Sequence, residues 1–129
     1  MMARLARRYH AVPRAPELPA PSPVRSLFAI ALENAIEGCV RETYGAVVNL
    51  VEARASSDPV VRKAMRSIAD DECRHAELAW AVAAWLRPRL TREERDAIER
   101  ATREAVAALA GDGDARIVGL LAARVWQAA

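Results

Sequence analysis

The chain has 129 residues, a length typical of one domain, and 53% of them are hydrophobic. Its 19 basic and 17 acidic residues give a formal net charge of +2, which excludes the strongly basic composition of nucleic-acid-binding domains. No apolar run is long enough for a membrane span, and without a secretion signal we expect a cytoplasmic protein whose cysteines, Cys39 and Cys73, stay reduced.

The composition predicts an all-α fold. Alanine, the strongest helix former, occurs 29 times, and arginine, which is close behind, occurs 18 times. No segment shows the strict alternation of apolar and polar residues that is typical of strands.

Residues 1–25 differ from the rest of the chain. They hold five of the seven prolines, and five arginines against the single acid Glu17. Proline at every second or third position prevents a helix and favours an extended chain. We expect a basic, proline-rich arm or linker, either a tail without structure or a segment that docks on an assembly partner, followed by a helical domain over residues 26–129.

Two long helices follow the arm and form a hairpin over residues 26–87. The first is predicted from Ser26 to about Ala55, and the second from Pro59 to about Arg87 with Asp58 as its N-cap. Because only a few residues join them, they should lie antiparallel and adjacent. A capping box that starts at Thr91 predicts a third helix over residues 91–110, and a fourth is expected over residues 114–128.

Each helix of the hairpin carries an apolar stripe interrupted by polar groups, and we call these stripes the two seams. The seam of the first helix consists of Ile30, Glu33, Glu37, Val40, Tyr44, Val47 and Val51. The seam of the second consists of Val61, Met65, Ile68, Glu72, His75, Ala79, Val82 and Leu86. Spacings of three and four place each set on one helix face, so the seams should pack together and bury carboxylates between them.

Buried carboxylates are costly unless they are paired or bound to a metal. Glu72 and His75 are three residues apart, so their side chains project together. A divalent metal would neutralise the carboxylates and take the neutral imidazole as a nitrogen ligand. The sequence therefore predicts a metal site that includes Glu72 and His75, with a carboxylate from the first helix.

This set of residues resembles the ferritin-like superfamily, whose members carry a glutamate on one bundle helix, a tyrosine seven residues later and Glu-x-x-His on the next antiparallel helix. Here the set is Glu37, Tyr44, Glu72 and His75. The stretches "NAIEGCVRETYGA" (34–46) and "IADDECRHAELAWAVAAWL" (68–86) are similar to a bacterial ferritin-like family, in which such a unit is usually the second of two halves. The resemblance covers residues 26–88 and implies a ferritin-like hairpin within a four-helix-bundle architecture.

One chain provides only half of such a site. A family dimetal site takes two Glu-x-x-His helices and two further glutamate helices, and this chain has one of each. His10, the second histidine, has Arg7 rather than a glutamate three residues before it. A homodimer or higher homo-oligomer with facing seams would complete the site, unless the third and fourth helices cover the seam. The alternative is a remnant that has lost its first half.

Several residues keep more than one interpretation. Glu42 competes with Glu37 as the ligand from the first helix, although it lies about 140° further around a straight helix. Tyr44 is either a group beside the metal, relaying an electron or bonding a ligand, or a core aromatic. Cys39 and Cys73 lie off both seams and are expected to be small buried residues.

The resemblance implies iron, as a di-iron site, with manganese or another first-row metal as the alternative. It also implies Fe(II) chemistry with dioxygen or peroxide, as in a ferroxidase or di-iron oxidoreductase. The competing hypothesis is a metal-free helical interaction module of the same fold, in which the polar groups fix the pairing of helices. Neither nucleic acid nor a membrane is expected as a partner.

Overall fold

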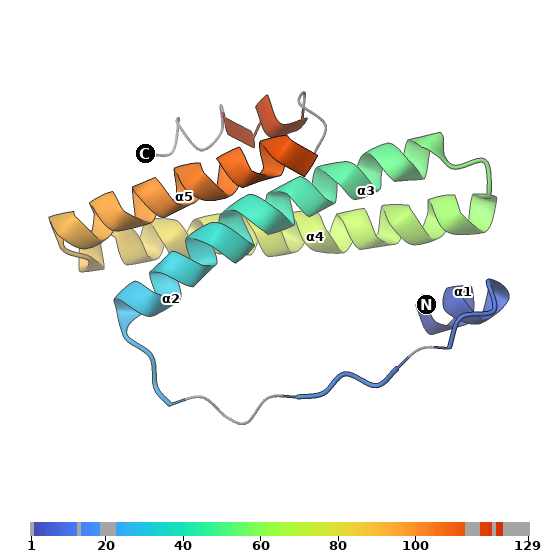
Figure 1. Ribbon diagram of the computed structural model, residues 1–129, viewed down its shortest axis with the longest axis horizontal. Helices are drawn as coiled ribbons and strands as arrows, with labels where there is room; N and C mark the ends of the chain where they lie inside the picture. The colour runs from blue at the N-terminus through green and yellow to red at the C-terminus, as the bar shows by residue number, and fades with distance from the viewer. Residues whose placement is uncertain (1, 13, 19–22, 113–116, 120, 123–129) are drawn as a thin grey trace.

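The computed structural model describes residues 2–12, 14–18, 23–112, 117–119 and 121–122 (Figure 1). All regular structure in these residues is helical, in agreement with the predicted all-α class. The elements are α1 (Met2–Arg8), α2 (Leu27–Glu33), the π-helix η1 (Asn34–Glu42), α3 (Thr43–Ala55), α4 (Pro59–Leu86), the short 3₁₀ turn η2 (Arg87–Arg89) and α5 (Arg92–Asp112). Most of the helix expected over 114–128 lies outside the described residues.

None of the described helices combines the length and the apolar character that crossing a membrane requires.

α2, η1 and α3 follow one another without a break and lie antiparallel to α4, as Figure 1 shows. The predicted caps are present. The Asp58 carboxylate accepts hydrogen bonds from the backbone N–H groups of Val60 and Val61 and so begins α4. Before α5, the Thr91 hydroxyl accepts from the N–H of Glu94, and the Glu94 carboxylate accepts from the N–H of Thr91.

Most of the buried residues of the two long helices are small. The buried residues of the first helix are Ala31, Ala35, Cys39, Val40, Ala46 and Ala53. Those of α4 are Ala64, Ala69, Ala76, Ala79 and Leu86. At the closest point, a Cβ added to Gly38 would lie 2.6 Å from the Cβ of Ala79. The backbones therefore approach each other more closely than larger side chains would permit.

The predicted seam of the first helix is wrong in part. Ile30, Glu33, Glu37 and Val51 are exposed, while the neighbouring alanines are buried. The prediction favoured bulky apolar residues, but a close helix contact is better filled by alanine and glycine, so the larger side chains point outward. The seam of α4 is placed more accurately, since Ala79 and Leu86 are buried and Glu72 is half-buried. His75 is the exception, because it lies at the edge of this face and is exposed.

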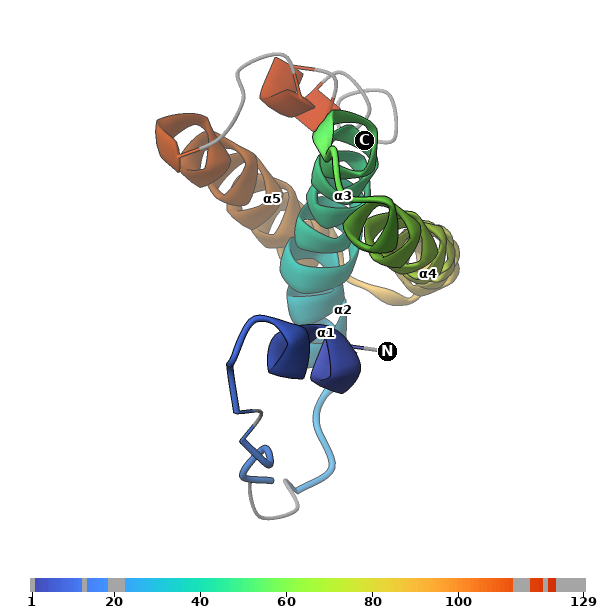
Figure 2. The same ribbon diagram turned by 90° about the vertical axis from the view of Figure 1, so that its right-hand side faces the viewer.

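α5 packs against η1 and α2, so α4 and α5 lie on either side of the continuous helix (Figure 2). One buried cluster on the α5 side joins Val40, Val106, Val118 and Leu121. A second joins Ala31, Leu86 and Leu90, with Ile98 of α5 packed against it. These clusters fix the position of α5 relative to the hairpin.

The arm touches the hairpin at the turn between α3 and α4. The Arg8 guanidinium lies 2.9 Å from the Asp58 carboxylate, and the Tyr9 hydroxyl donates to the same carboxylate over 3.3 Å. Val12, Leu18 and Val24, further along the arm, are exposed. The Asp58 side chain thus caps α4 and also holds the end of α1.

We predict that Gly38→Ala destabilises the protein by about 1–3 kcal/mol, because the new methyl group overlaps Ala79 and the two helices must separate. Urea denaturation followed by circular dichroism measures this change.

Gly45→Ala is the matched control. It lies in the same continuous helix, and an added Cβ meets no atom within 4 Å. It should stabilise the protein by up to about 1 kcal/mol through helix propensity alone. Equal effects of the two substitutions would contradict the close contact at Gly38.

Candidate metal centre

Three of the residues considered as ligands come together between η1 and α4. Glu42, Glu72 and His75 each place one ligand atom so that the three atoms lie within 4.8 Å of one another. His75 Nδ1 lies 3.6 Å from Glu42 Oε2 and 3.9 Å from Glu72 Oε2. We call these three residues the Glu–Glu–His cluster. Two oxygens and one nitrogen form a donor set that suits a first-row divalent metal.

The π-helical geometry of η1 brings Glu42 to face α4. Asn34, Gly38 and Glu42 are four residues apart, and an ideal α-helix would rotate each by about 40° relative to the one before. In a π-helix the hydrogen bonds join residues five apart, so each residue turns less around the axis. Asn34 donates a 2.9 Å hydrogen bond to the carbonyl oxygen of Ala79, and Gly38 lies against the same residue. Glu42 then follows on this face.

The two carboxyl groups of the cluster act on each other. Hydrogen bonding to Glu42 raises the pKa of Glu72, and burial and the negative charge of Glu42 act in the same direction. The positive charge that His75 can carry opposes this effect. Glu42 Oε2 is buried and has no hydrogen-bond partner. A cation between the carboxylates would offset the repulsion between Glu42 and Glu72 and would give Glu42 Oε2 a partner.

Glu37 lies outside the cluster. Its carboxylate is exposed and pairs with Arg41 one turn further along, with the two groups 2.7 Å apart. Of the two candidates on the first helix, the structure therefore places Glu42, and not Glu37, beside Glu72 and His75. Tyr44 is also outside the cluster, because it packs on the α5 side against the buried residues around Val40.

The cysteines offer no thiolate to the cluster. Cys39 is buried, and burial raises the pKa of its thiol to about 11, so the group stays protonated at neutral pH. Cys73 is half-buried.

Trp80 donates through Nε1 to the Thr43 hydroxyl over 3.2 Å, and this hydroxyl donates to the carbonyl oxygen of Cys39.

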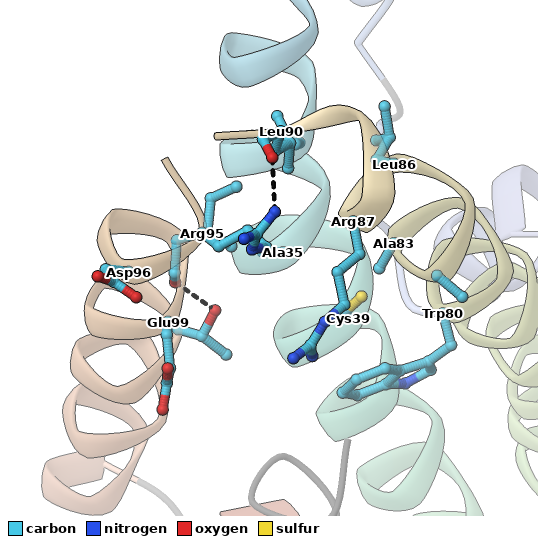
Figure 3. A pocket seen from close by; sticks show the side chains of 14 residues that line it. Ala35, Cys39, Trp80, Ala83, Leu86, Arg87, Leu90, Arg95, Asp96 and Glu99 are labelled. Atoms are coloured by element: carbon cyan, nitrogen blue, oxygen red, sulfur yellow. Dashed lines mark hydrogen bonds between the residues drawn. The ribbon is translucent and has the colours of Figure 1, made fainter. Parts of the chain in front are cut away.

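A separate hollow of about 380 Å³ lies between the C-terminal half of α4 and α5, as Figure 3 shows. Cys39 and Trp80 line it with alanines and leucines, and Asp96 and Glu99 of α5 lie on its opposite wall. No member of the Glu–Glu–His cluster lines this hollow. Trp80 and His75 are five residues apart on α4, or about 140° around the helix, so His75 points away from the α5 side.

The features that sequence reasoning missed are the small residues that position the cluster. Asn34 and Gly38 were not considered, although their spacing of four with Glu42 was visible in the sequence. A glycine and a small polar residue on the same helix face as a candidate ligand would have indicated these positions.

Comparison of the chain with protein-family models, with curated proteins and with solved structures gives no match. The resemblance to the ferritin-like superfamily therefore remains a prediction from the residues quoted above.

We predict that Glu72→Gln stabilises the metal-free protein at pH 7.5, raising Tm by about 2 °C. The pKa of Glu72 is raised on folding, so the ionised carboxylate is less stable in the folded than in the unfolded chain. This unfavourable effect is absent below the ordinary carboxyl pKa, grows between that pKa and the raised pKa of the folded protein, and is complete above the latter. The gain from Glu72→Gln should therefore disappear below about pH 4.

Thermal unfolding in the presence of a chelator at both pH values measures the effect. Glu37→Gln is the control, because Glu37 is exposed and lies beside Arg41, and it should not raise Tm. A fall of several degrees for Glu72→Gln would indicate a structural polar network instead, as the metal-free hypothesis requires.

Proposed function

We propose that this protein binds a first-row metal, with iron as the expected ion, through the Glu–Glu–His cluster, and that a second copy of the chain completes the site. The observation that carries the proposal is the convergence of Glu42, Glu72 and His75 within 4.8 Å. The resemblance to the ferritin-like superfamily supports iron and a two-metal site.

The residues present fit a metal. Glu42 Oε2 is buried and has no hydrogen-bond partner, although His75 Nδ1 lies 3.6 Å from it. Two carboxyl groups meet here, and their proximity raises the pKa of Glu72. Such a pair shares a proton or binds a cation. Glu42 and Glu72 would supply oxygen ligands and His75 a nitrogen ligand, and bound iron would supply redox chemistry with dioxygen or peroxide.

The three ligands of one chain do not enclose a metal. The His75 side chain is 62% exposed, while those of Glu42 and Glu72 are 36% and 28% exposed. A metal held only by these groups would be open to water on one side. Ligands from a second copy would close the site.

Among the described residues, the face of α4 around His75 is exposed, and a second copy could pack on it. His75, Leu78 and Trp85 are three and seven residues apart and so lie on one side of the helix. Leu78 and Trp85 are 64% and 54% exposed. α5 does not cover this side, because it packs against η1 and α2. An exposed apolar stripe beside an incomplete polar site is typical of a subunit contact.

We predict that metal-free protein binds about one Fe(II) per chain under anaerobic conditions, and that air then oxidises the bound iron. Glu42→Gln and His75→Ala should each weaken binding by more than about tenfold, because each removes a ligand. Isothermal titration and the absorbance of Fe(III) measure binding and oxidation.

Glu37→Gln is the matched control, since it removes the same charge from the same helix outside the cluster. It should leave the affinity within about twofold of the unmodified protein. Loss of binding in Glu37→Gln with normal binding in Glu42→Gln would contradict the site described here. Absence of stoichiometric binding by the unmodified protein would favour the metal-free module.

We predict that Leu78→Glu converts a dimer into a monomer and abolishes iron oxidation while leaving the helical content unchanged. A charged group on this stripe would be buried without a partner in the subunit contact. Ala108→Glu introduces the same charge at an exposed position of α5 and should change neither mass nor oxidation. Light scattering on the metal-loaded protein gives the mass, and an oxidising monomer of Leu78→Glu would exclude a shared site.

A further inference from the structure

One end of the molecule concentrates positive charge. This end comprises α1, the last turn of α3, the turn between α3 and α4, and the first turns of α4, and the contact of Arg8 with Asp58 joins α1 to the rest (Figure 1). Its exposed cations are Arg4, Arg7, Arg8, Arg54, Arg62, Lys63 and Arg66. The acids in the same region are Glu52, Asp58 and Asp70. We call these seven cations the basic end.

Most cations of the basic end have no acidic partner. Within the described residues, only Arg8 among them forms an ion pair, and its partner is Asp58. Elsewhere four arginines form ion pairs, and three of these pairs join residues one turn apart: Arg41 with Glu37, Arg74 with Asp71 and Arg103 with Glu99. At the opposite end, arginines between residues 87 and 95 are interspersed with acids at 93, 94, 96 and 99. What distinguishes the basic end is therefore its excess of positive charge, seven cations against three acids.

The cations of α4 surround a depression. Arg62, Lys63 and Arg66 line a shallow hollow of about 450 Å³ together with Ser67 and Asp70. Arginine can bind a carboxylate with two parallel hydrogen bonds, and a serine hydroxyl can donate a third. The hollow thus offers donors for a short run of carboxylates.

We propose that the basic end is a docking surface for an acidic, partly apolar segment of a partner protein. Tyr9 and Val60 are exposed beside the cations, so a segment with both carboxylates and apolar side chains has partners for each. Nucleic acid fits less well, because its binding relies on many phosphate contacts along a basic stripe. Here the cations are confined to one end, and Asp58 lies among them.

The experiment uses the full chain and a labelled peptide of glutamate interspersed with leucine, with fluorescence anisotropy as the readout. Lys63→Glu combined with Arg66→Glu should weaken binding about tenfold, through lost attraction and added repulsion. The milder Lys63→Gln with Arg66→Gln should weaken it about threefold. Binding by the unmodified protein should fall as salt increases.

Arg92→Glu combined with Arg100→Glu is the matched control, because it changes the net charge equally at exposed positions of α5. Its effect should stay below about twofold. Equal weakening by the control would show that net charge alone attracts the peptide and would overturn the proposal. Tighter binding of duplex DNA or of phosphatidylserine vesicles than of the peptide would also overturn it.

Discussion

Gly38 lies so close to Ala79 that a methyl group does not fit between the two long helices. At the same level, the Asn34 side chain donates a hydrogen bond to the carbonyl oxygen of Ala79. The contact fixes the separation and the register of the hairpin at this level. Because helices are stiff, it also fixes which residues meet one turn further along, where Glu42 faces Glu72 and His75. The position of the candidate site thus depends on a contact between residues that carry no chemistry of their own.

The same contact accounts for the electrostatics of the cluster. Helices that approach through glycine and alanine leave little room for water between them, so the Glu42 carboxylate is partly desolvated. One of its oxygens is buried without a partner, and its proximity raises the pKa of Glu72. An unpaired buried oxygen lowers stability. Replacing Glu42 or Glu72 with glutamine or leucine would relieve the unfavourable interaction between them. Residues that are unfavourable for folding at such a contact are expected where they serve binding.

Helix boundaries and caps were predictable because they depend on local sequence. Asp58 before Pro59, and Thr91 three residues before Glu94, satisfy backbone N–H groups that any helix leaves unpaired. The all-α class followed from alanine and arginine content. The cluster residues Glu72 and His75 were also found from sequence, because their spacing of three keeps them together on any regular helix.

The choice between Glu37 and Glu42 was less accessible to sequence analysis. It depends on the phase of the first helix, and η1 changes that phase through hydrogen bonds of a different spacing. Nothing in a residue pattern read with a period of 3.6 anticipates such a segment. The outward position of Ile30 and Val51 has a related cause, since the preference for small residues at a close contact overrides hydrophobicity. The position of α5 was likewise open, because it depends on packing between elements distant in sequence.

The position of α5 bears on the proposal that a second copy of the chain completes the metal site. A helix added after the hairpin has two sides on which to pack, and α5 takes the side of Trp80 and Cys39 rather than that of His75. The buried cluster around Val40 and Val106 stabilises this choice. One flank of the hairpin is thereby covered by α5, while within the described part of the chain the flank that carries His75, Leu78 and Trp85 is exposed. An additional helix on the His75 side would have supplied a closed bundle but no second set of ligands, since no other Glu-x-x-His sequence occurs in the chain. The proposed completion of the site by a second copy requires that side to be open.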